Sequence, residues 1–500
     1  MKRIYTTTYK IALFSAVALL PLSCNKFLDE MPDNRTDLDN ADKITQVLVS
    51  AYAEVLPTTM MELMSDNVTD YGREIDVYQT YFEQAYRFQE VTGDGLDTPA
   101  SVWEANYNAI ASANAALDAI ENLGGGEELD PQKGEALICR AYGHFTLVTT
   151  FCQAYNTETS SSDLGIPYVT EPETTVYVDR ERGTVAEVYR MIAADIEEGY
   201  PLIDDTRFTQ PKYHFNRAAA AAFAAQFYLY YGDYERAVHY ADEAIGIDPT
   251  SLYRDWNLYT GTSIDEYANA YISTDEAANF LNQGYNTLAA RVTYGRFIHS
   301  EAKAAEVLGG STPWGSLSSL PVGSMYIYEQ RADLSPKLTE YFIITDPVAN
   351  TGVPYCVNVV FTSEKTMIDR AEAYALDGNY NAAANDLNSF YHSLGLTGTL
   401  SADQISEYYG TSSYNNPDLA PRGLVLADDM QTNLVKACLH ARRLMTLHEG
   451  ARFLDLKRYG IAYTHELDGE APVTVSPYDL RLAIQLPSAV ISAGMTPNPR

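Results

Sequence analysis

The chain has 500 residues, with 34 lysines and arginines against 67 aspartates and glutamates, so its formal net charge is −33. A surface this acidic repels the phosphates of nucleic acids and anionic lipids, which argues against a protein that binds either one through charge. Hydrophobic residues make up 46% and charged residues 20% of the chain, which excludes an intrinsically disordered protein and predicts a large folded core.

The first 23 residues read as a signal peptide. Cations precede an apolar run at 11–22, which is too short to cross a bilayer as a helix, since about 20 apolar residues are needed. Ser23 is small and directly precedes Cys24, the arrangement that a lipoprotein signal peptidase needs. We therefore predict lipidation of Cys24, with its acyl chains as the membrane anchor. Pro21 stands where a lipobox usually has leucine, so a plain secretory signal is the alternative.

The four remaining cysteines, at 139, 152, 356 and 438, form no closely spaced pair and have no histidines at metal-binding spacing. The sequence therefore predicts no metal site and no cofactor. We expect most of these cysteines to be buried free thiols, with one disulfide as the alternative.

Helical periodicity, with apolar residues three and four positions apart, marks several segments. It predicts helices at about 40–56, 100–123, 131–153, 184–200 and 430–459. In the second of these, Trp103 shares one helical face with Tyr107, Ile110 and Asn114, which indicates a core residue and not a ligand contact.

Aromatic and hydrogen-bonding side chains alternate between residues 67 and 86. Tyr71, Tyr78 and Tyr81 lie there beside Asp70 and Arg73. A phenol ring is apolar on its faces and polar at its tip, which suits carbohydrate recognition. We take the three tyrosines as candidate ligand contacts; packing of the first helices is the alternative.

Two stretches, 214–248 and 367–390, are copies of one pattern. Each reads as two helices broken at a glycine, Gly232 in the first and Gly378 in the second, with alanines and tyrosines at matching places. Small residues let paired helices approach closely and glycine relieves the turn, as in a tetratricopeptide repeat. The predicted fold class is mainly α: about four such hairpins in a right-handed stack, with a less regular, loop-rich insertion.

The insertion covers about 250–335, where the helical signal fades. Trp256 and Trp314 lie in segments without a helical face, and an exposed indole offers a flat plate for stacking on a sugar. Both are candidate ligand contacts, with local loop packing as the alternative. After the insertion, the β-branched and aromatic run at 353–361 is the best strand candidate.

The sequence LMTLHEGARFLDLKRYG at 444–460 resembles the signature of the SusD/RagB family of outer-membrane nutrient-binding lipoproteins. Further matching traits are CNKFLDEMP after the leader, WEANYNAIASAN at 103–114, RAEAY from Arg370, and PNP near the end of the chain. The resemblance covers nearly the whole chain. It implies a single domain at 24–500, with tetratricopeptide-like helices at about 40–248 and 364–460.

Within the signature, Glu449, Arg452, Asp455 and Arg458 recur every three residues. On one helix this spacing predicts a ladder of alternating charges that attaches the terminal helix to the body, with Gly450 allowing close helix packing. A catalytic acid/base pair of Glu449 and Asp455 is the alternative. It is disfavoured because each carboxylate has an arginine within reach, which should keep both ionised. We expect Arg452→Ala to destabilise the fold.

The resemblance implies a surface-exposed lipoprotein of the outer membrane that binds an oligosaccharide and delivers it to a SusC-like TonB-dependent transporter, acting as its lid. It implies neither catalysis nor a cofactor. A peptide- or glycopeptide-binding member of the same family is the alternative. A helical glycoside hydrolase and a tetratricopeptide scaffold are weaker ones, since no Ser-centred elbow, phosphate loop or HExxH motif occurs and the repeats are not tandem.

Overall fold

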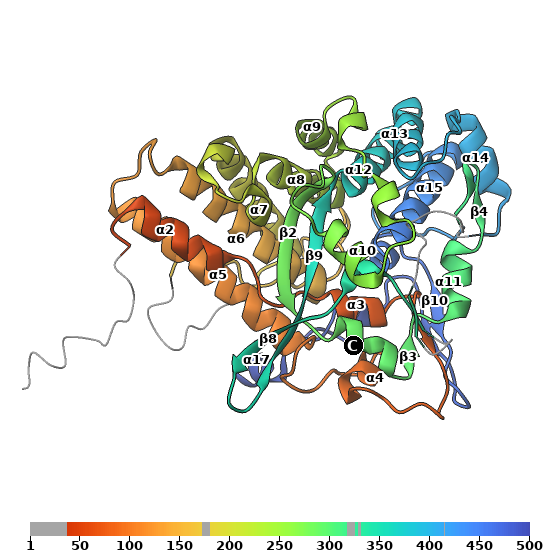
Figure 1. The fold of residues 1–500 in the computed structure, drawn as a ribbon, viewed down its shortest axis with the longest axis horizontal. Coiled ribbons are helices and arrows are strands. Elements are labelled where there is room, and N and C mark those ends of the chain that lie inside the picture. Colours follow the sequence, from red (N-terminus) through yellow and green to blue (C-terminus); the bar gives the residue numbers. More distant parts are fainter. Residues whose placement is uncertain (1–37, 173–180, 318–325, 329–331, 415) are drawn as a thin grey trace, which may run out of the picture.

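A computed structural model describes residues 38–172, 181–317, 326–328, 332–414 and 416–500 (Figure 1). The leader and Cys24 lie outside this range, as does part of the predicted insertion. The described chain is mainly helical, as its sequence predicts. Its longer helices are α5 (Pro99–Asn122), α6 (Asp130–Phe151), α7 (Val185–Gly199), α8 (Arg217–Tyr231), α9 (Tyr234–Ile245), α12 (Ser363–Leu376), α13 (Tyr380–Ser393), α14 (Ala402–Thr411) and α15 (Asp429–Met445).

The tetratricopeptide-like hairpins are confirmed. In both predicted copies the chain reverses at a glycine with the same left-handed φ of 82°, Gly232 between α8 and α9 and Gly378 between α12 and α13. Only a residue without a Cβ adopts this conformation at little cost. Ala219 to Ala222 of α8 are buried, and α9 contacts α12, so the two hairpins stack on each other (Figure 1).

The first predicted helix is shorter than its periodicity suggests. α2 (Ala41–Leu48) and a 3-10 turn, η1 (Val49–Ala51), end at Tyr52, whose backbone is extended. The Tyr52 hydroxyl donates to Glu135 Oε1 at 2.7 Å and accepts the N–H of Phe215 at 2.7 Å. These tertiary bonds hold the chain out of the helix. Two short helices follow, α3 (Thr58–Leu63) and α4 (Thr80–Tyr86).

An antiparallel sheet of order β2-β9-β8 joins the insertion to the segment that follows it. Its strands are β2 (Asn279–Asn286), β9 (Thr351–Thr362) and β8 (Tyr341–Asp346). β9 confirms the predicted strand, whereas the sequence gave no sign of β2. Other elements are short helices and two-stranded pairs. They are α10 (Ile264–Tyr271), α11 (Glu301–Leu308), β1 (Thr69–Asp70), β3 (Phe297–Ile298), β4 (Ser311–Thr312), β5 (Gly315–Ser316), β6 (Tyr326–Tyr328), β7 (Ala332–Leu334), β10 (Tyr463–His465) and β11 (Val473–Val475).

The predicted helix at 430–459 is two helices. α15 ends at Met445, and α16 (Ala451–Arg458) begins after a turn in which His448 and Gly450 have φ values of 70° and 75°. A Cβ on Gly450 would lie 2.9 Å from the Cβ of Met61 and the carbonyl of Thr58, so α3 packs directly on this turn. The close packing expected of Gly450 is therefore present. The last helix, α17 (Ser488–Ser492), precedes the C-terminus.

Cys139, Cys152, Cys356 and Cys438 are all buried free thiols. Burial raises the pKa of Cys152 to about 11, which keeps that thiol protonated and unreactive. Of the helices in the described part of the chain, none combines the length and apolarity needed to cross a membrane.

Candidate ligand-binding face

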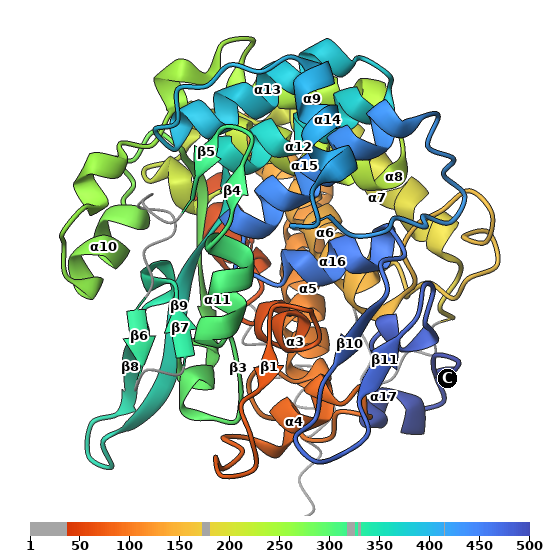
Figure 2. The same ribbon diagram turned by 90° about the vertical axis from the view of Figure 1, so that its right-hand side faces the viewer.

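Two stretches that are far apart in the sequence meet where β1 pairs with β3. Thr69 lies opposite Ile298 and Asp70 opposite Phe297, and the N–H of Tyr71 donates to the carbonyl of Arg296 at 3.0 Å. Figure 2 shows this strand pair beside α4 at one end of the molecule. The tyrosine-rich region around residues 67–86 and the insertion therefore form a single surface.

Four tyrosines gather at this junction, and we call the surface they form the tyrosine face: Tyr71, Tyr78, Tyr81 and Tyr294. Tyr71 and Tyr294 are 45% and 51% exposed. The ring of Tyr78 lies 6.5 Å from that of Tyr294, centroid to centroid, and stacks on Phe82 at 6.3 Å. Tyr81 meets Phe82 edge to face at 4.9 Å. Exposed rings with fixed neighbours are suited to stacking on a flat ligand.

Charged side chains lie at the margin of the tyrosine face. Arg291 donates two 2.6 Å hydrogen bonds to Glu340, and both side chains remain partly exposed. The hydrogen bond to Glu340, and a smaller one involving Tyr78, raise the pKa of Arg291. The guanidinium therefore remains a permanent donor beside the rings.

A buried ion pair locks the strand junction. Arg296 donates to both carboxylate oxygens of Asp70. Burial would raise the pKa of Asp70, but the bonds from Arg296 and from the N–H groups of Asp468 and Gly72 bring it below its usual range. The turn between β10 and β11 contributes a second bond here, because Asp468 also accepts the N–H of Arg73 at 3.0 Å.

Asp97 holds the loop before α5 against the segment that leads to Tyr294. Its carboxylate accepts the hydroxyl of Thr287 and the N–H of Leu288, both at 2.7 Å, and it is 2% exposed. Burial raises the pKa of Asp97 to about 6, although these hydrogen bonds oppose the shift. The loop before α5 is thus bound to the segment that leads to Tyr294.

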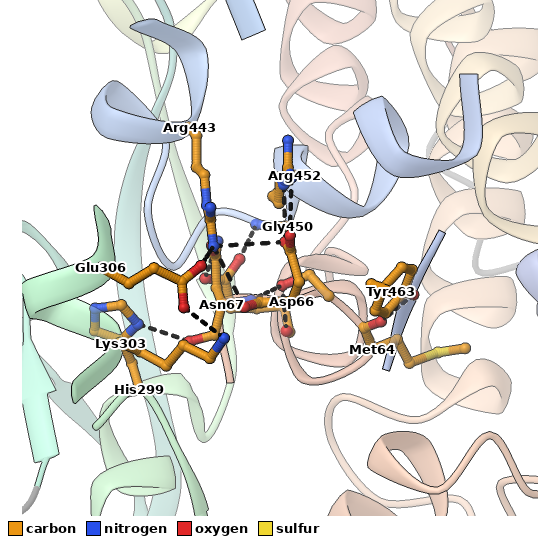
Figure 3. A network of polar contacts seen from close by, with 12 residues as sticks. Met64, Asp66, Asn67, His299, Lys303, Glu306, Arg443, Gly450, Arg452 and Tyr463 are labelled. Atoms are coloured by element: carbon orange, nitrogen blue, oxygen red, sulfur yellow. Dashed lines mark hydrogen bonds and ion pairs between the residues drawn. The ribbon is translucent and has the colours of Figure 1, made fainter. Parts of the chain in front are cut away.

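A polar network beneath the face fixes the loop between α3 and β1 (Figure 3). Arg452 donates two 2.8 Å bonds to Asp66, and Arg443 donates to Asn67 Oδ1 at 2.8 Å. The carbonyl of Asn67 bonds His299 Nδ1 at 2.7 Å, next to β3. Burial lowers the pKa of His299 to about 4, so its ring is neutral at pH 7. The network ties β1 and β3 to the C-terminal helices.

The signature residues do attach the terminal helix, but the predicted ladder is wrong. Glu449 lies in the turn before α16 and binds Lys337 and Lys365, each at 2.5 Å. Arg452 reaches Asp66 and not its helical neighbours. Asp455 and Arg458 alone keep the expected contact, at 3.3 Å. The reason is the break at Gly450, which turns Glu449 off the helix.

The pKa values of the two signature carboxylates shift in opposite directions. Burial would raise the pKa of Glu449, but Lys337 and Lys365 outweigh it and lower that pKa below its usual range. Burial raises the pKa of Asp455, against the pull of Arg442 and Arg458. The expected arginine partners are present at Asp455, where Arg442 and Arg458 contact the carboxylate, whereas the partners of Glu449 are lysines. In the described residues no three metal-ligating side chains come together.

The tryptophans lie away from the tyrosine face. Trp314, between β4 and β5, is 6% exposed, donates to Asn388 at 2.7 Å and stacks on Tyr391 at 4.0 Å. Trp256 is 7% exposed and packs on Tyr259. In this conformation neither indole offers a free face, so ligand contact through them stays a prediction that needs a rearrangement. Trp103 is half-buried against Tyr107 and Phe151.

Tyr294 and Arg291 were not singled out from the sequence. A sequence pattern that could have identified Tyr294 is its position beside Gly295 and Arg296 in the insertion. A ring next to a hydrogen-bond donor is the same pattern that drew attention to Tyr71 and Arg73. What the sequence lacked was any indication that the two segments pair.

Residues 26–229 match the sequence model of the SusD-like family described as starch-binding and associating with the outer membrane. No curated protein gives a significant match. Among solved structures, a SusD superfamily protein from Bacteroides vulgatus is 20% identical, with a TM-score of 0.63 over 93% of this chain and 98% of that one.

A putative sugar binding protein from Bacteroides vulgatus is 17% identical, with a TM-score of 0.67 over 93% of this chain and 99% of that one. A laminarin binding SusD-like protein is 15% identical, with a TM-score of 0.58 over 92% and 99%. At these identities the similarity establishes a common fold along nearly the entire chain.

Proposed function

Because this chain is a member of the SusD-like family, we propose that it binds a glycan on its tyrosine face and passes it on unchanged. The observation that carries the proposal is a pair of exposed rings at the strand junction: Tyr294 lies beside Tyr78, and the backbone of Tyr71 bonds that of Arg296. Sugar rings stack their C–H faces on aromatic rings while their hydroxyls bond charged and amide groups.

The rigidity of the surface supports a binding role. The Asp70–Arg296 pair and the bond between His299 and Asn67 join the two segments of the face, while Asp97 and Asp66 fasten the loops beside them. Such support keeps the rings in place before the ligand arrives, so less entropy is lost on binding.

The family description places starch binding at the outer membrane, and one structural relative is named as laminarin binding. We therefore expect an oligosaccharide ligand ahead of a peptide. Residues 24–500 would form one domain anchored through lipidated Cys24 at the cell exterior. From there the protein would act as a lid on a SusC-like TonB-dependent transporter, opening and closing as a rigid body without catalysis.

Calorimetry on residues 24–500 tests the binding claim, with laminarin and starch oligosaccharides as probes. Tyr71→Ala and Tyr294→Ala should each weaken binding of the preferred glycan by about 1 kcal/mol, roughly a fivefold rise in Kd, because a stacking surface is lost. Tyr213→Ala is the control, since Tyr213 is 48% exposed but lies in a different part of the fold, before α8. Equal affinity in all four proteins would refute the assignment.

A further inference from the structure

A groove of about 630 Å³ lies between α5 and β2, and none of its lining residues belongs to the tyrosine face. Its floor is a row of small side chains along α5, including Ser101, Ala105 and Ser112. At 1.5 Å per helical residue this row is about 16 Å long. The segment around Tyr52 and the turn at Tyr213 also line it. In Figure 1, α2 and α5 lie beside β2, which is an edge strand.

The groove exposes a short stretch of the free edge of β2. On the edge of β2 that faces away from β9, the N–H of Asn286 donates to the carbonyl of Glu54. On the same edge, the carbonyl of Phe280 accepts a hydrogen bond from Asn216 Nδ2. Alternate residues of a strand direct their backbone groups to the same side. The N–H and C=O groups of Asn282 and Gly284 therefore point to this edge, between its two closed ends.

Gly284 is an unusual residue for this position. It is exposed in a strand whose neighbours Gln283 and Tyr285 are buried, and a Cβ added to it would meet no atom within 4 Å. Glycine weakens the interior of a strand, and it often marks a place where a ligand or another backbone approaches closely. Here the open space in front of Gly284 is the groove itself.

The lining is rich in hydrogen-bond acceptors. Gln283 is 4% exposed, and its Nε2 donates to the carbonyl of Ala53 at 2.7 Å, but its Oε1 has no partner among the described residues. The Oδ1 of Asn282 is likewise without a partner. Glu54 and Glu104 line the groove with exposed side chains, and no lysine or arginine lines it. The two acids, with no lysine or arginine beside them in the lining, favour a ligand that brings a cation.

We propose that this groove binds an extended peptide segment bearing lysine or arginine, which pairs with the edge of β2 at Asn282 and Gly284. A strand rises about 3.3 Å per residue, so the floor accommodates roughly five residues. Backbone pairing supplies the N–H donors, and the basic side chains reach Glu54 and Glu104. A neutral sugar chain would leave both glutamates without a counter-charge. The proposal goes beyond glycan binding, and it uses different residues.

Residues 24–500 and a blocked hexapeptide of alternating lysine and threonine provide the test by calorimetry. We expect saturable binding, with a Kd at least tenfold higher in Gly284→Phe, because a side chain at this position starts in open space and its phenyl ring would compete with the peptide for the groove. Gly284→Ala is the matched control and should change the Kd less than twofold. Unchanged melting temperature and unchanged glycan affinity in Gly284→Phe would show that the fold and the tyrosine face are intact.

A second set of variants tests the charge of the ligand. The double change Glu54→Gln and Glu104→Gln should raise the Kd for the basic peptide at least fivefold, whereas Glu121→Gln, exposed at the end of α5, should not. A hexapeptide of alternating glutamate and threonine should not bind. The proposal is overturned if the basic peptide fails to bind, if Gly284→Phe binds it normally, or if a chitosan oligomer alone binds in a Gly284-dependent manner.

Discussion

Arg452 is the residue through which the C-terminal signature supports the tyrosine face. Its guanidinium is 5% exposed and binds Asp66, which is 17% exposed. Arg443 approaches the same carboxylate at 3.7 Å. Burial would raise the pKa of Asp66, but the two arginines outweigh it and hold that pKa far below its usual range. The Arg452–Asp66 pair therefore stabilises the fold at every pH at which Asp66 is ionised.

We predict that Arg452→Ala lowers the free energy of unfolding by about 3 kcal/mol, because the largely buried carboxylate of Asp66 loses its two short hydrogen bonds and keeps only the 3.7 Å contact with Arg443. Urea unfolding of the mature chain measures this change. Arg236→Ala is the control, since Arg236 is 53% exposed and pairs with Asp233 on the surface, and it should cost less than about 1 kcal/mol. Equal losses in the two variants would contradict a special role for Arg452.

Asp97 should make stability depend on pH in the direction opposite to an ordinary ion-paired acid. Its pKa is about 6 in the folded chain against a usual 3.8, so between these values the folded state binds more protons than the unfolded state. The contribution of Asp97 is therefore present below pH 4 and is lost as the pH rises towards 6. At 1.36 kcal/mol per pKa unit the loss is about 3 kcal/mol.

Asp97→Asn isolates this effect, because an amide oxygen can still accept the N–H of Leu288. The difference in unfolding free energy, variant minus wild type, should rise by about 2 to 3 kcal/mol between pH 4 and pH 7. Denaturant titrations at several pH values measure it. Parallel curves for the two proteins would show that Asp97 is not protonated more readily in the fold.

At the scale of elements, the turn between α15 and α16 depends on a glycine for two separate reasons. Gly450 has a left-handed φ, and its α-carbon faces Met61 and Thr58 at a distance that leaves no room for a side chain. Gly232, between α8 and α9, has a similar φ but open space around it. The two positions thus separate the backbone cost of a Cβ from its packing cost.

Gly232→Ala should destabilise the protein by about 1 kcal/mol, the conformational cost alone. Gly450→Ala should cost at least 2 kcal/mol more, because α3 must move away from the turn. Thermal and urea unfolding of both variants give the comparison. If Gly450→Ala were no worse than Gly232→Ala, the close contact between α3 and the turn would be relaxed in solution.

Periodic elements could be predicted from the sequence because their signal is local. The alanines of α8 and the glycines at 232 and 378 encode two hairpins that the structure contains. β2 could not be predicted in this way. Its sequence NFLNQGYN contains residues that favour turns, and it becomes a strand because β9 pairs with it and burial covers Asn282 and Gln283. The ladder of signature charges failed for a related reason, since the partners of Glu449 and Arg452 lie in other elements.

For the molecule as a whole, the candidate site exists only after folding. Tyr78 and Tyr294 lie in separate segments that the β1–β3 pair brings together, and no local pattern announces that pairing. Sequence reasoning therefore identified three of the four tyrosines as candidates and the two regions as separate binding stretches. It could not predict that they form one face, nor that Trp256 and Trp314 fold inwards.

The membrane anchor and the binding surface should be separable properties of the molecule. The described body begins at residue 38, and neither the tyrosine face nor the network in Figure 3 includes any residue before it. The whole chain has a net charge of −33 even with its basic leader, so the body has no electrostatic attraction to anionic lipids. We therefore expect attachment to depend on acyl chains at Cys24, as proposed above, with a contribution of about 0.8 kcal/mol per buried methylene.

We predict that Cys24→Ala leaves the melting temperature and the glycan affinity unchanged, while the protein disappears from the membrane fraction. Fractionation with a high-salt wash measures this, and the wild-type protein should resist the same wash because its attachment is not electrostatic. The test belongs in cells that lack the partner transporter, since a transporter could retain the body by itself. Membrane retention of Cys24→Ala in those cells would show that another part of the chain contacts the bilayer, and the lipid tether would no longer explain where the protein is held.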